Sequence, residues 1–445
     1  MENLLARAQV PGPRRMPDVL AETQWRERVP KKGFVTPSPT PVVTRVAALL
    51  TPRRIAVWGI GLLVVTWFIY VHTMMVPGLT DRAGRFKGTD YIQFYVFGSL
   101  AHDGRMDALY DPDVHLAEGR RRIQPDLSLY AGHPNYGPQI ALAFVPLARL
   151  PFGSSLAVFL LITAIAYALS VWIVWRECPA LSAHGRLVAL LAAASPSFLT
   201  VVRYAQLSAL SLLLWSLALL AIRRNRRFTA GLVIGCLVYK PQLGIVIGVV
   251  LLAAREWRVV AGAAVTGLGQ LGVAWAAAGS ATMAAYFGSL WTLMLNPGLL
   301  VIEPSEVHSV RGFLQLLVPS PPVVTLGFLA ALVAILVLAV RSWSTPAPAA
   351  VRWGQVILLT ILASPHLMTY DLVLLTLPLL VFTDWILRNP DHPLRPEIAL
   401  WLVLAYLTPF SSFLARAARV QVSVVVMAIL AWRMYLVCTT AARET

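Results

Sequence analysis

The chain has 445 residues, of which 58% are hydrophobic and 13% are charged, and its mean hydropathy is +0.68. Soluble domains carry about 25% charged residues, so this composition excludes an ordinary soluble protein and predicts a polytopic membrane protein. The formal net charge is +16, but many of the basic residues fall in the first 54 positions and in short clusters between apolar runs. A nucleic-acid-binding protein needs a continuous basic face, so we expect no nucleic-acid partner.

Residues 1–54 are rich in proline and arginine and precede the first apolar run. A signal peptide has a shorter basic region and a small-residue cleavage site, so we predict a largely disordered, basic cytoplasmic tail. The three cysteines, Cys178, Cys236 and Cys438, have neither metal-site nor disulfide spacing. No His-Cys-carboxylate spacing indicates a metal site, and no Gly-rich phosphate loop indicates nucleotide hydrolysis.

Apolar runs follow in chain order, and a helix of about 20 residues is needed to cross the hydrocarbon layer. The runs lie at 55–76, 153–175, 187–201, 206–222, 228–239, 241–254, 259–278, 321–340, 354–363, 367–387, 397–414 and 420–438. They predict an all-α membrane domain over 55–440 with about twelve spanning helices. The runs too short to span unaided are 187–201, 228–239, 241–254 and 354–363. Broken helices at membrane depth are tolerated where they line a cavity, so these runs predict one.

The distribution of arginine predicts the orientation, because Lys and Arg are enriched in cytoplasmic loops. Arginines follow the even-numbered segments, which places both termini in the cytoplasm. The long loop 77–152 and the loop 279–320 are then extracytoplasmic.

Polar residues follow the odd-numbered segments, so the same parity places them all on the outer side. They are Asp90, Arg203, Gln206, Lys240, Gln242, His308, Arg311, His366 and Tyr370. We interpret this set as a candidate site that opens to the extracytoplasmic face.

Lys240 interrupts a pair of runs that together offer about 25 apolar residues, and a lysine near the hydrocarbon costs about 2.5–3.5 kcal/mol. An anion should offset that cost, and phosphate suits a compact ammonium group. The alternative is a lysine that extends to the outer membrane interface. Pro241 can begin a new helix after the break.

Asp90 precedes the aromatic residues Tyr91, Phe94, Tyr95 and Phe97, which predict an amphipathic helix at the membrane interface. Such a helix would hold Asp90 at the cavity mouth, where a partly desolvated carboxylate can act as a general base. The alternative is an ordinary loop carboxylate. The later acids of the same loop have the pattern of solvated turn residues; they are Asp103, Asp107, Asp111 and Asp113.

The remaining candidates each have a structural alternative. His366 and Tyr370 are four residues apart, which places them on one face of a helix, but His366 is equally compatible with a structural role. Arg203 and Arg311 could instead anchor to lipid headgroups, and His308 lies three residues before Arg311.

Five stretches resemble, in order, glycosyltransferase family 87, whose members are integral membrane enzymes of the GT-C type. They are GTDYIQFYVFGSLAHDGRMDALYD, YGPQIALAFVPLARLP, AQLSALSLLLWSLAL, FTAGLVIGCLVYKPQLGIVI and LLTILASPHLMTYDLVLLTLPLL. The resemblance covers roughly residues 55–390. Relatives often have Tyr-Pro-Pro where this chain has Tyr136-Gly137-Pro138, and Gly-Gln where it has Ala205-Gln206.

The resemblance implies a sugar transferase of a bacterial cytoplasmic membrane that uses a polyprenyl-phosphate sugar, with mannose or arabinofuranose as the sugar. It implies that Asp90 is the base, that Lys240 contacts the donor phosphate and that His366 lies near the donor. The run 138–151 would be a helix along the membrane. The expected partners are the lipid-linked donor, a glycolipid or glycan acceptor, and membrane lipids.

Sugar transfer from a phosphate leaving group is chemically compatible with one carboxylate and several cations. One carboxylate can deprotonate an acceptor hydroxyl while cations stabilise the leaving phosphate, so no cofactor is expected. Direct displacement inverts the anomeric centre, whereas retention requires a second, nucleophilic carboxylate. The competing interpretations are a twelve-span secondary transporter, against which the chain shows no repeated half, and a scaffold for envelope polymers.

Overall fold

The computed structural model describes residues 40–124, 134–295 and 303–440. Within these ranges the chain is helical and forms no β-sheet; its only strand-like pairings are isolated bridges between Thr80 and Phe86 and between Val307 and Met368. The predicted all-α class is therefore confirmed for the described residues.

The first described elements are α2 (Pro41–Ala48) and α3 (Pro52–Met74). A proline follows Thr40 and another follows Thr51, and proline fits the first turn of a helix because its missing N–H needs no partner there. The structure therefore differs from the predicted disordered tail over residues 41–54, while residues 1–39 lie outside the described part. Helix α2 packs against α18.

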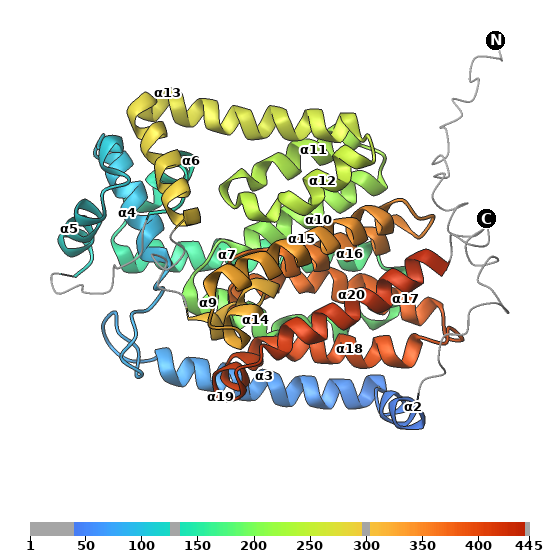
Figure 1. Ribbon diagram of the computed structural model, residues 1–445. Coiled ribbons are helices and arrows are strands. Elements are labelled where there is room, and N and C mark those ends of the chain that lie inside the picture. The colour runs from blue at the N-terminus through green and yellow to red at the C-terminus, as the bar shows by residue number, and fades with distance from the viewer. Residues whose placement is uncertain (1–39, 125–133, 296–302, 441–445) are drawn as a thin grey trace, which may run out of the picture.

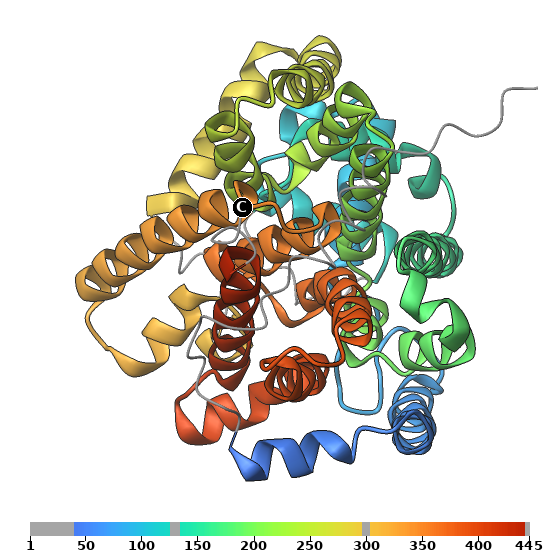
Figure 2. The same ribbon diagram turned by 90° about the vertical axis from the view of Figure 1, so that its right-hand side faces the viewer.

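Most helices of the main bundle run side by side, from left to right in Figure 1. Its members are α7 (Phe152–Arg176), α8 (Gly185–Ala193), α9 (Pro196–Tyr204), α10 (Ser208–Arg223), α15 (Pro321–Trp343), α16 (Ala349–Ala363), α17 (Thr376–Arg388), α18 (Arg395–Leu407) and α20 (Val422–Thr440). Figure 2 looks along this direction and shows α3 at the edge. Every residue of α16 from Trp353 to Ala363 is buried, as expected of a helix that is apolar on all sides.

Short helices connect members of the main bundle. They are η2 (Pro179–His184), η6 (Pro304–Glu306), α14 (Val310–Leu317), η7 (Thr369–Leu375), η8 (Thr408–Ser411) and α19 (Ser412–Ala418). Helix η7 follows the buried α16 and packs against α9 and α10, so it lies deep in the molecule.

Among the described residues, 7 helices are long and apolar enough to span a membrane, or up to 8 if the pair Pro179–Ala193 and Pro196–Tyr204, bent by 43°, is one span. The predicted count of twelve is therefore not confirmed. The other predicted runs do form helices, but these are shorter, because polar residues and prolines end them early.

Two of these short runs form a hairpin with Lys240 at its tip. One arm is α11 (Arg227–Gly235) with η3 (Cys236–Tyr239), and the other is η4 (Pro241–Leu243) with α12 (Ile245–Ala253). At the far end an ion pair between Arg227 and Glu256 joins the arms. Thirteen residues rise about 20 Å, which is less than the hydrocarbon thickness of about 30 Å.

Helix α13 (Trp257–Leu295) supports this hairpin and bends at Gly279, whose φ is +79°. Its first half packs closely on α11, since a Cβ on Gly231 or Gly235 would overlap backbone atoms of α13, and one on Gly262 would overlap backbone atoms of α11. Small residues at such contacts let two membrane helices approach closely. The second half of α13, which begins the predicted outer loop 279–320, turns toward α6 (Figure 1).

A cap of short helices covers one end of the bundle (Figure 1). It consists of α4 (Tyr91–His102), η1 (Met106–Ala108), α5 (Pro112–Arg122) and α6 (Pro138–Ala148). The aromatic residues of α4 form a second core with α6 and the start of α7, and Tyr91, Phe94 and Phe97 are at most 1% exposed. The sequence predicted an interfacial helix, but α4 is apolar on nearly all sides, so it is buried within the protein.

Candidate functional site

Asp90 lies where the cap meets the bundle, directly before α4. Its backbone N–H donates to the carbonyl of Tyr204 at 3.1 Å, and its Oδ2 accepts a 2.8 Å hydrogen bond from Nε2 of Gln206. Tyr204 is the last residue of α9, and Gln206 lies in the turn between α9 and α10. The structure therefore brings two of the predicted site residues, Asp90 and Gln206, into direct contact.

The amide of Gln206 is held from its other side as well. Its Oε1 accepts from the backbone N–H of Leu207 at 2.8 Å and from the hydroxyl of Tyr136 at 3.3 Å. These donors orient the amide so that its NH₂ group faces the carboxylate. Tyr136 was not among the predicted site residues, although it belongs to the Tyr-Gly-Pro stretch that departs from the family pattern.

The turn that carries Gln206 has a strained residue. Ala205 has φ +53°, in the left-handed region, where a residue with a Cβ costs about 1 kcal/mol more than glycine. Glycine would adopt this conformation without the cost, and the short Ala205 side chain keeps the cost small in this chain.

The environment raises the pKa of Asp90 to about 6. Burial is the largest cause; hydrogen bonds from Gln206 and Tyr370 and the charge of Lys240 oppose it, and the charge of Asp371 adds to it. The carboxylate is therefore mostly ionised at pH 7 yet basic enough to accept a proton, which is the range expected of a general base.

Lys240, at the hairpin tip, is 4% exposed and already has an anionic partner. Its Nζ lies 2.7 Å from Oδ1 of Asp371, and Ser208 Oγ lies 3.2 Å from the same Nζ and 2.5 Å from the same Oδ1. The sequence predicted phosphate as the anion near Lys240, but in the structure the nearby anion is Asp371 from η7. An acidic residue inside the apolar run 367–387 was the signal that could have identified it.

Tyr370 lies between Lys240 and Tyr204, the residue whose carbonyl accepts from Asp90. The Lys240 ammonium lies 5.4 Å from the centre of the Tyr370 ring, and that ring packs edge-on against Tyr204 at 5.6 Å. His366 lies in the turn before η7, so it does not share a helical face with Tyr370 as the spacing predicted. The proline at 365 and the early end of α16 are the reason.

Two arginines of the predicted set, Arg203 and Arg311, have no ion pair or hydrogen bond among the described residues. Arg311, in the first turn of α14, is half-buried and burial lowers its pKa. Burial and the nearby Arg311 charge lower the pKa of His366 to about 4, so its imidazole is neutral at pH 7. Arg203 is also half-buried, and its guanidinium lies 6.0 Å from the centre of the Tyr204 ring.

His308 and Gln242 lie apart from these contacts. His308 is fully buried, and its nitrogens face the hydroxyls of Ser423 at 2.8 Å and Thr369 at 2.9 Å. Both ring nitrogens are thus occupied, and burial lowers its pKa to about 3. Gln242 is half-buried in η4, close in sequence to Lys240.

The later acids of the first outer loop have structural partners. Asp103 accepts from Arg121 and Arg122, each at 2.7 Å or less, and Asp111 caps α5 by accepting from the N–H groups of Asp113 and Val114. These contacts match the turn role that the sequence predicted for Asp103 and Asp111.

The family comparison decides the class of protein. Residues 135–365, just over half of the chain, match glycosyltransferase family 87. The chain belongs to this family. No curated protein matches, and no solved structure matches. Family 87 membership, together with several apolar helices, supports a membrane glycosyltransferase and does not favour the transporter.

The family 87 match and the cluster around Asp90 overlap in part. Tyr136, Gln206, Lys240 and Arg311 lie inside the matched range. Asp90 and the segment 366–371 lie outside it, and their inclusion rests on the contacts described above.

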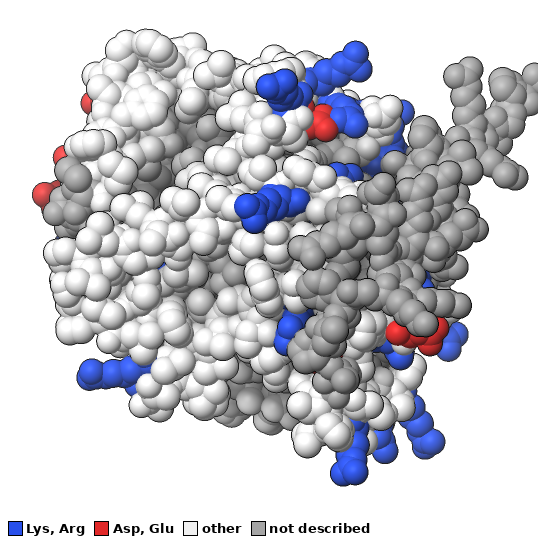
Figure 3. Space-filling view, turned by 45° about the vertical axis from the view of Figure 1, so that its right-hand side comes forward, with Lys and Arg blue, Asp and Glu red and all other residues white. Residues whose placement is uncertain are grey.

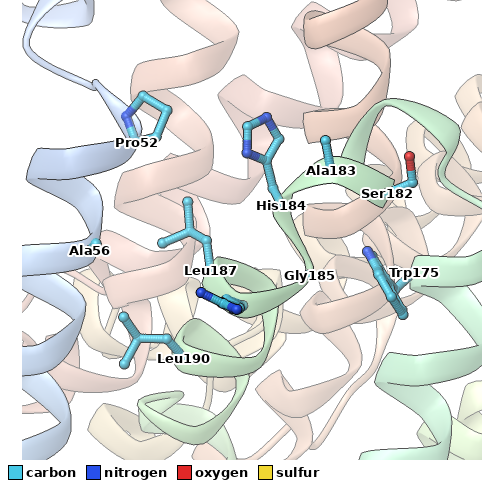
Figure 4. A pocket seen from close by; sticks show the side chains of 10 residues that line it. Pro52, Ala56, Trp175, Ser182, Ala183, His184, Gly185, Leu187 and Leu190 are labelled. Atoms are coloured by element: carbon cyan, nitrogen blue, oxygen red, sulfur yellow. The ribbon is translucent and has the colours of Figure 1, made fainter.

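Two further features bear on where this family 87 enzyme binds ligands. No group of three or more His, Cys, Asp or Glu residues that could hold a metal ion occurs within the described ranges. A pocket of about 610 Å³ lies between α3, η2 and α8 and is lined by Pro52, Trp175, His184 and Arg186 among others (Figure 4). Asp90 follows the other end of α3, a helix of about 34 Å, so this pocket is remote from the Asp90 cluster.

Proposed function

We propose that this protein transfers a sugar from a polyprenyl-phosphate donor to a hydroxyl group of an envelope glycolipid or glycan. The observation that carries the proposal is the Asp90 carboxylate, whose pKa is near 6 and which is held by Gln206 beside the Lys240–Asp371 pair. Mannose is the favoured sugar by analogy with the family, with arabinofuranose as the alternative.

Asp90 is the proposed general base. It accepts the proton of the acceptor hydroxyl as that oxygen forms a bond to the anomeric carbon of the donor. The bond between the anomeric carbon and the phosphate oxygen breaks, and its electron pair leaves with the polyprenyl phosphate. A single displacement inverts the anomeric centre, and a phosphate leaving group needs no protonation at pH 7.

The donor phosphate is assigned to the half-buried cations. Arg203 and Arg311 have no ion pair or hydrogen bond among the described residues. A guanidinium group can donate two parallel hydrogen bonds to two oxygens of one phosphate. Neutral His366, beside Arg311, can donate a hydrogen bond to the same phosphate. Lys240 contributes its charge from within the Asp371 pair, and Gln242 and Tyr370 line the same region. His308 is assigned a positioning role through Thr369. No resident cofactor is required, because these cations stabilise the leaving phosphate.

The proposed location is a bacterial cytoplasmic membrane, with both termini in the cytoplasm and Asp90 on the extracytoplasmic face. Figure 3 is in keeping with this orientation, since most basic side chains on the visible face lie in its right-hand half, whereas acidic side chains lie at its left edge.

The test is transfer of radiolabelled mannose from a synthetic polyprenyl-phosphate mannose by the purified protein in detergent. We expect Asp90→Asn to abolish transfer at normal protein levels. For the wild type, the rate should fall below pH about 6, because protonated Asp90 cannot accept a proton and its pKa is raised to about 6.

Asp113→Asn is the matched control, because Asp113 lies in the same outer loop, in the first turn of α5, and makes no side-chain contact with the Asp90 cluster. Full activity of Asp90→Asn would refute the assignment of the base. Uptake of substrate into sealed proteoliposomes without a covalent product would refute the transferase.

A further inference from the structure

Gln139, in the first turn of α6, is a buried amide without a partner. It is 8% exposed, and neither its Oε1 nor its Nε2 has a hydrogen-bond partner among the described residues. A buried amide normally finds partners, because leaving its donors and acceptors unmade is costly. A site that binds a polar ligand is one setting in which such an amide is retained.

The backbone before α6 leaves room for this amide. Gly137 is the N-cap of α6, no side chain caps this helix end, and the Gln139 amide folds back against Gly137. A Cβ on Gly137 would overlap the amide oxygen. A residue with a side chain at position 137 would therefore exclude this position of the amide, so the arrangement depends on Gly137.

The segment that carries Gln139 is tied to the base. The Tyr136 hydroxyl bonds to Gln206, which in turn bonds to Asp90. The segment is also fixed from outside, since the Tyr136 carbonyl accepts from Tyr110 at 2.8 Å and the Pro134 carbonyl accepts from Ser289 at 2.5 Å.

The segment before α6 also brings two other carboxamides together. Gln93, one helical turn after Asp90, donates to Asn135 at 3.4 Å, so carboxamides from α4 and from the segment before α6 meet here. The cations proposed for phosphate come from other elements, namely α9 and α14. Carboxamides suit hydroxyl groups, because each amide offers both a donor and an acceptor.

We propose that Gln139 binds hydroxyl groups of the acceptor sugar, which makes it a specificity-determining residue of this chain. The inference rests on the proposed function, since it takes Asp90 as the base that must lie within hydrogen-bond reach of the acceptor. The Gln139 amide and a pair of neighbouring sugar hydroxyls satisfy each other when the acceptor is bound.

The test compares Gln139→Met with the wild type, because methionine has a similar shape and no hydrogen-bonding amide. With methyl α-D-mannopyranoside as acceptor, we expect KM for the acceptor to rise about tenfold while kcat and KM for the donor change little. Without ligand, the variant should melt at a higher temperature, because an unpaired buried amide has been removed.

Two further variants sharpen the test. Gly137→Ala should raise the acceptor KM in the same way, because its Cβ displaces the amide while the flexible end of Gln139 can move without disturbing the fold. Gln315→Met, at an exposed position on α14, should change neither quantity.

An unchanged acceptor KM, or a lower melting temperature for Gln139→Met, would overturn the inference, because the amide would then have a partner other than the acceptor. A second readout needs no turnover: methyl α-D-mannopyranoside should raise the melting temperature of the wild type and not that of Gln139→Met. If this shift occurs but no sugar is transferred, the proposed function fails and the binding inference stands. If the wild type transfers sugar but neither the variants nor the ligand change the acceptor KM or the melting temperature, the inference about Gln139 fails and the proposed function stands.

Discussion

At the residue scale, the buried ion pair between Lys240 and Asp371 determines how charge is arranged around Asp90. The two groups are 2.7 Å apart and share the hydroxyl of Ser208. Lys240 lowers the pKa of Asp90 and Asp371 raises it, so the two charges of the pair act on the base in opposite directions. The unpaired charges of the cluster are therefore Asp90 itself and the arginines.

We predict that breaking this pair from one side is more harmful than removing it entirely. Lys240→Met and Asp371→Leu should each lower the free energy of unfolding by about 3–5 kcal/mol, because each leaves one buried charge uncompensated. The double variant should lose less than the sum of the two, measured by thermal melting in detergent. Strictly additive losses would show that the two side chains do not interact in the folded protein.

At the scale of elements, the α11–α12 hairpin places a charged residue inside an apolar molecule. Its arms are too short to cross the membrane, and α13 holds one of them through close backbone contact at Gly231, Gly235 and Gly262. The GxxxG spacing from Gly231 to Gly235 was visible in the sequence. Its partner on α13 could not be identified without the fold.

A comparison of two glycines on α13 tests this contact. Gly262→Ala should destabilise the protein, because its Cβ would overlap the backbone of α11. Gly269→Ala should be neutral or stabilising, since nothing lies within 4 Å of its Cβ and alanine favours helix by about 1 kcal/mol. Melting temperatures of the two variants in the same detergent provide the measurement, and equal values would argue against the close α11–α13 contact.

At the scale of the whole molecule, both ends of the bundle contain ion pairs, and the end opposite the cap also carries exposed arginines. The cap holds Asp103 and Glu118 against Arg121 and Arg122. The opposite end carries exposed arginines such as Arg186 and Arg224, and the chain has a net charge of +16. An excess of unpaired arginine is typical of the cytoplasmic side.

Single cysteines at the two ends test this orientation. Asp107→Cys, exposed in the cap, should react with a membrane-impermeant thiol reagent in intact cells. Arg224→Cys, exposed at the opposite end, should react only after permeabilisation. The wild type is the control for the native cysteines, of which Cys178 and Cys438 are buried. The reverse labelling pattern would invert the proposed topology.

The sequence by itself determined the helical class, the positions of the apolar segments, the family resemblance and the grouping of Asp90 with Gln206, Lys240 and Tyr370. These follow from local hydropathy and from polar residues at the ends of apolar runs, which are properties of neighbouring residues. Only the tertiary structure decided that Asp371 neutralises Lys240, that Tyr136 orients Gln206 and that the aromatic face of α4 is buried. Such contacts join residues 70 or more positions apart or depend on which helix faces meet, and no local pattern encodes them.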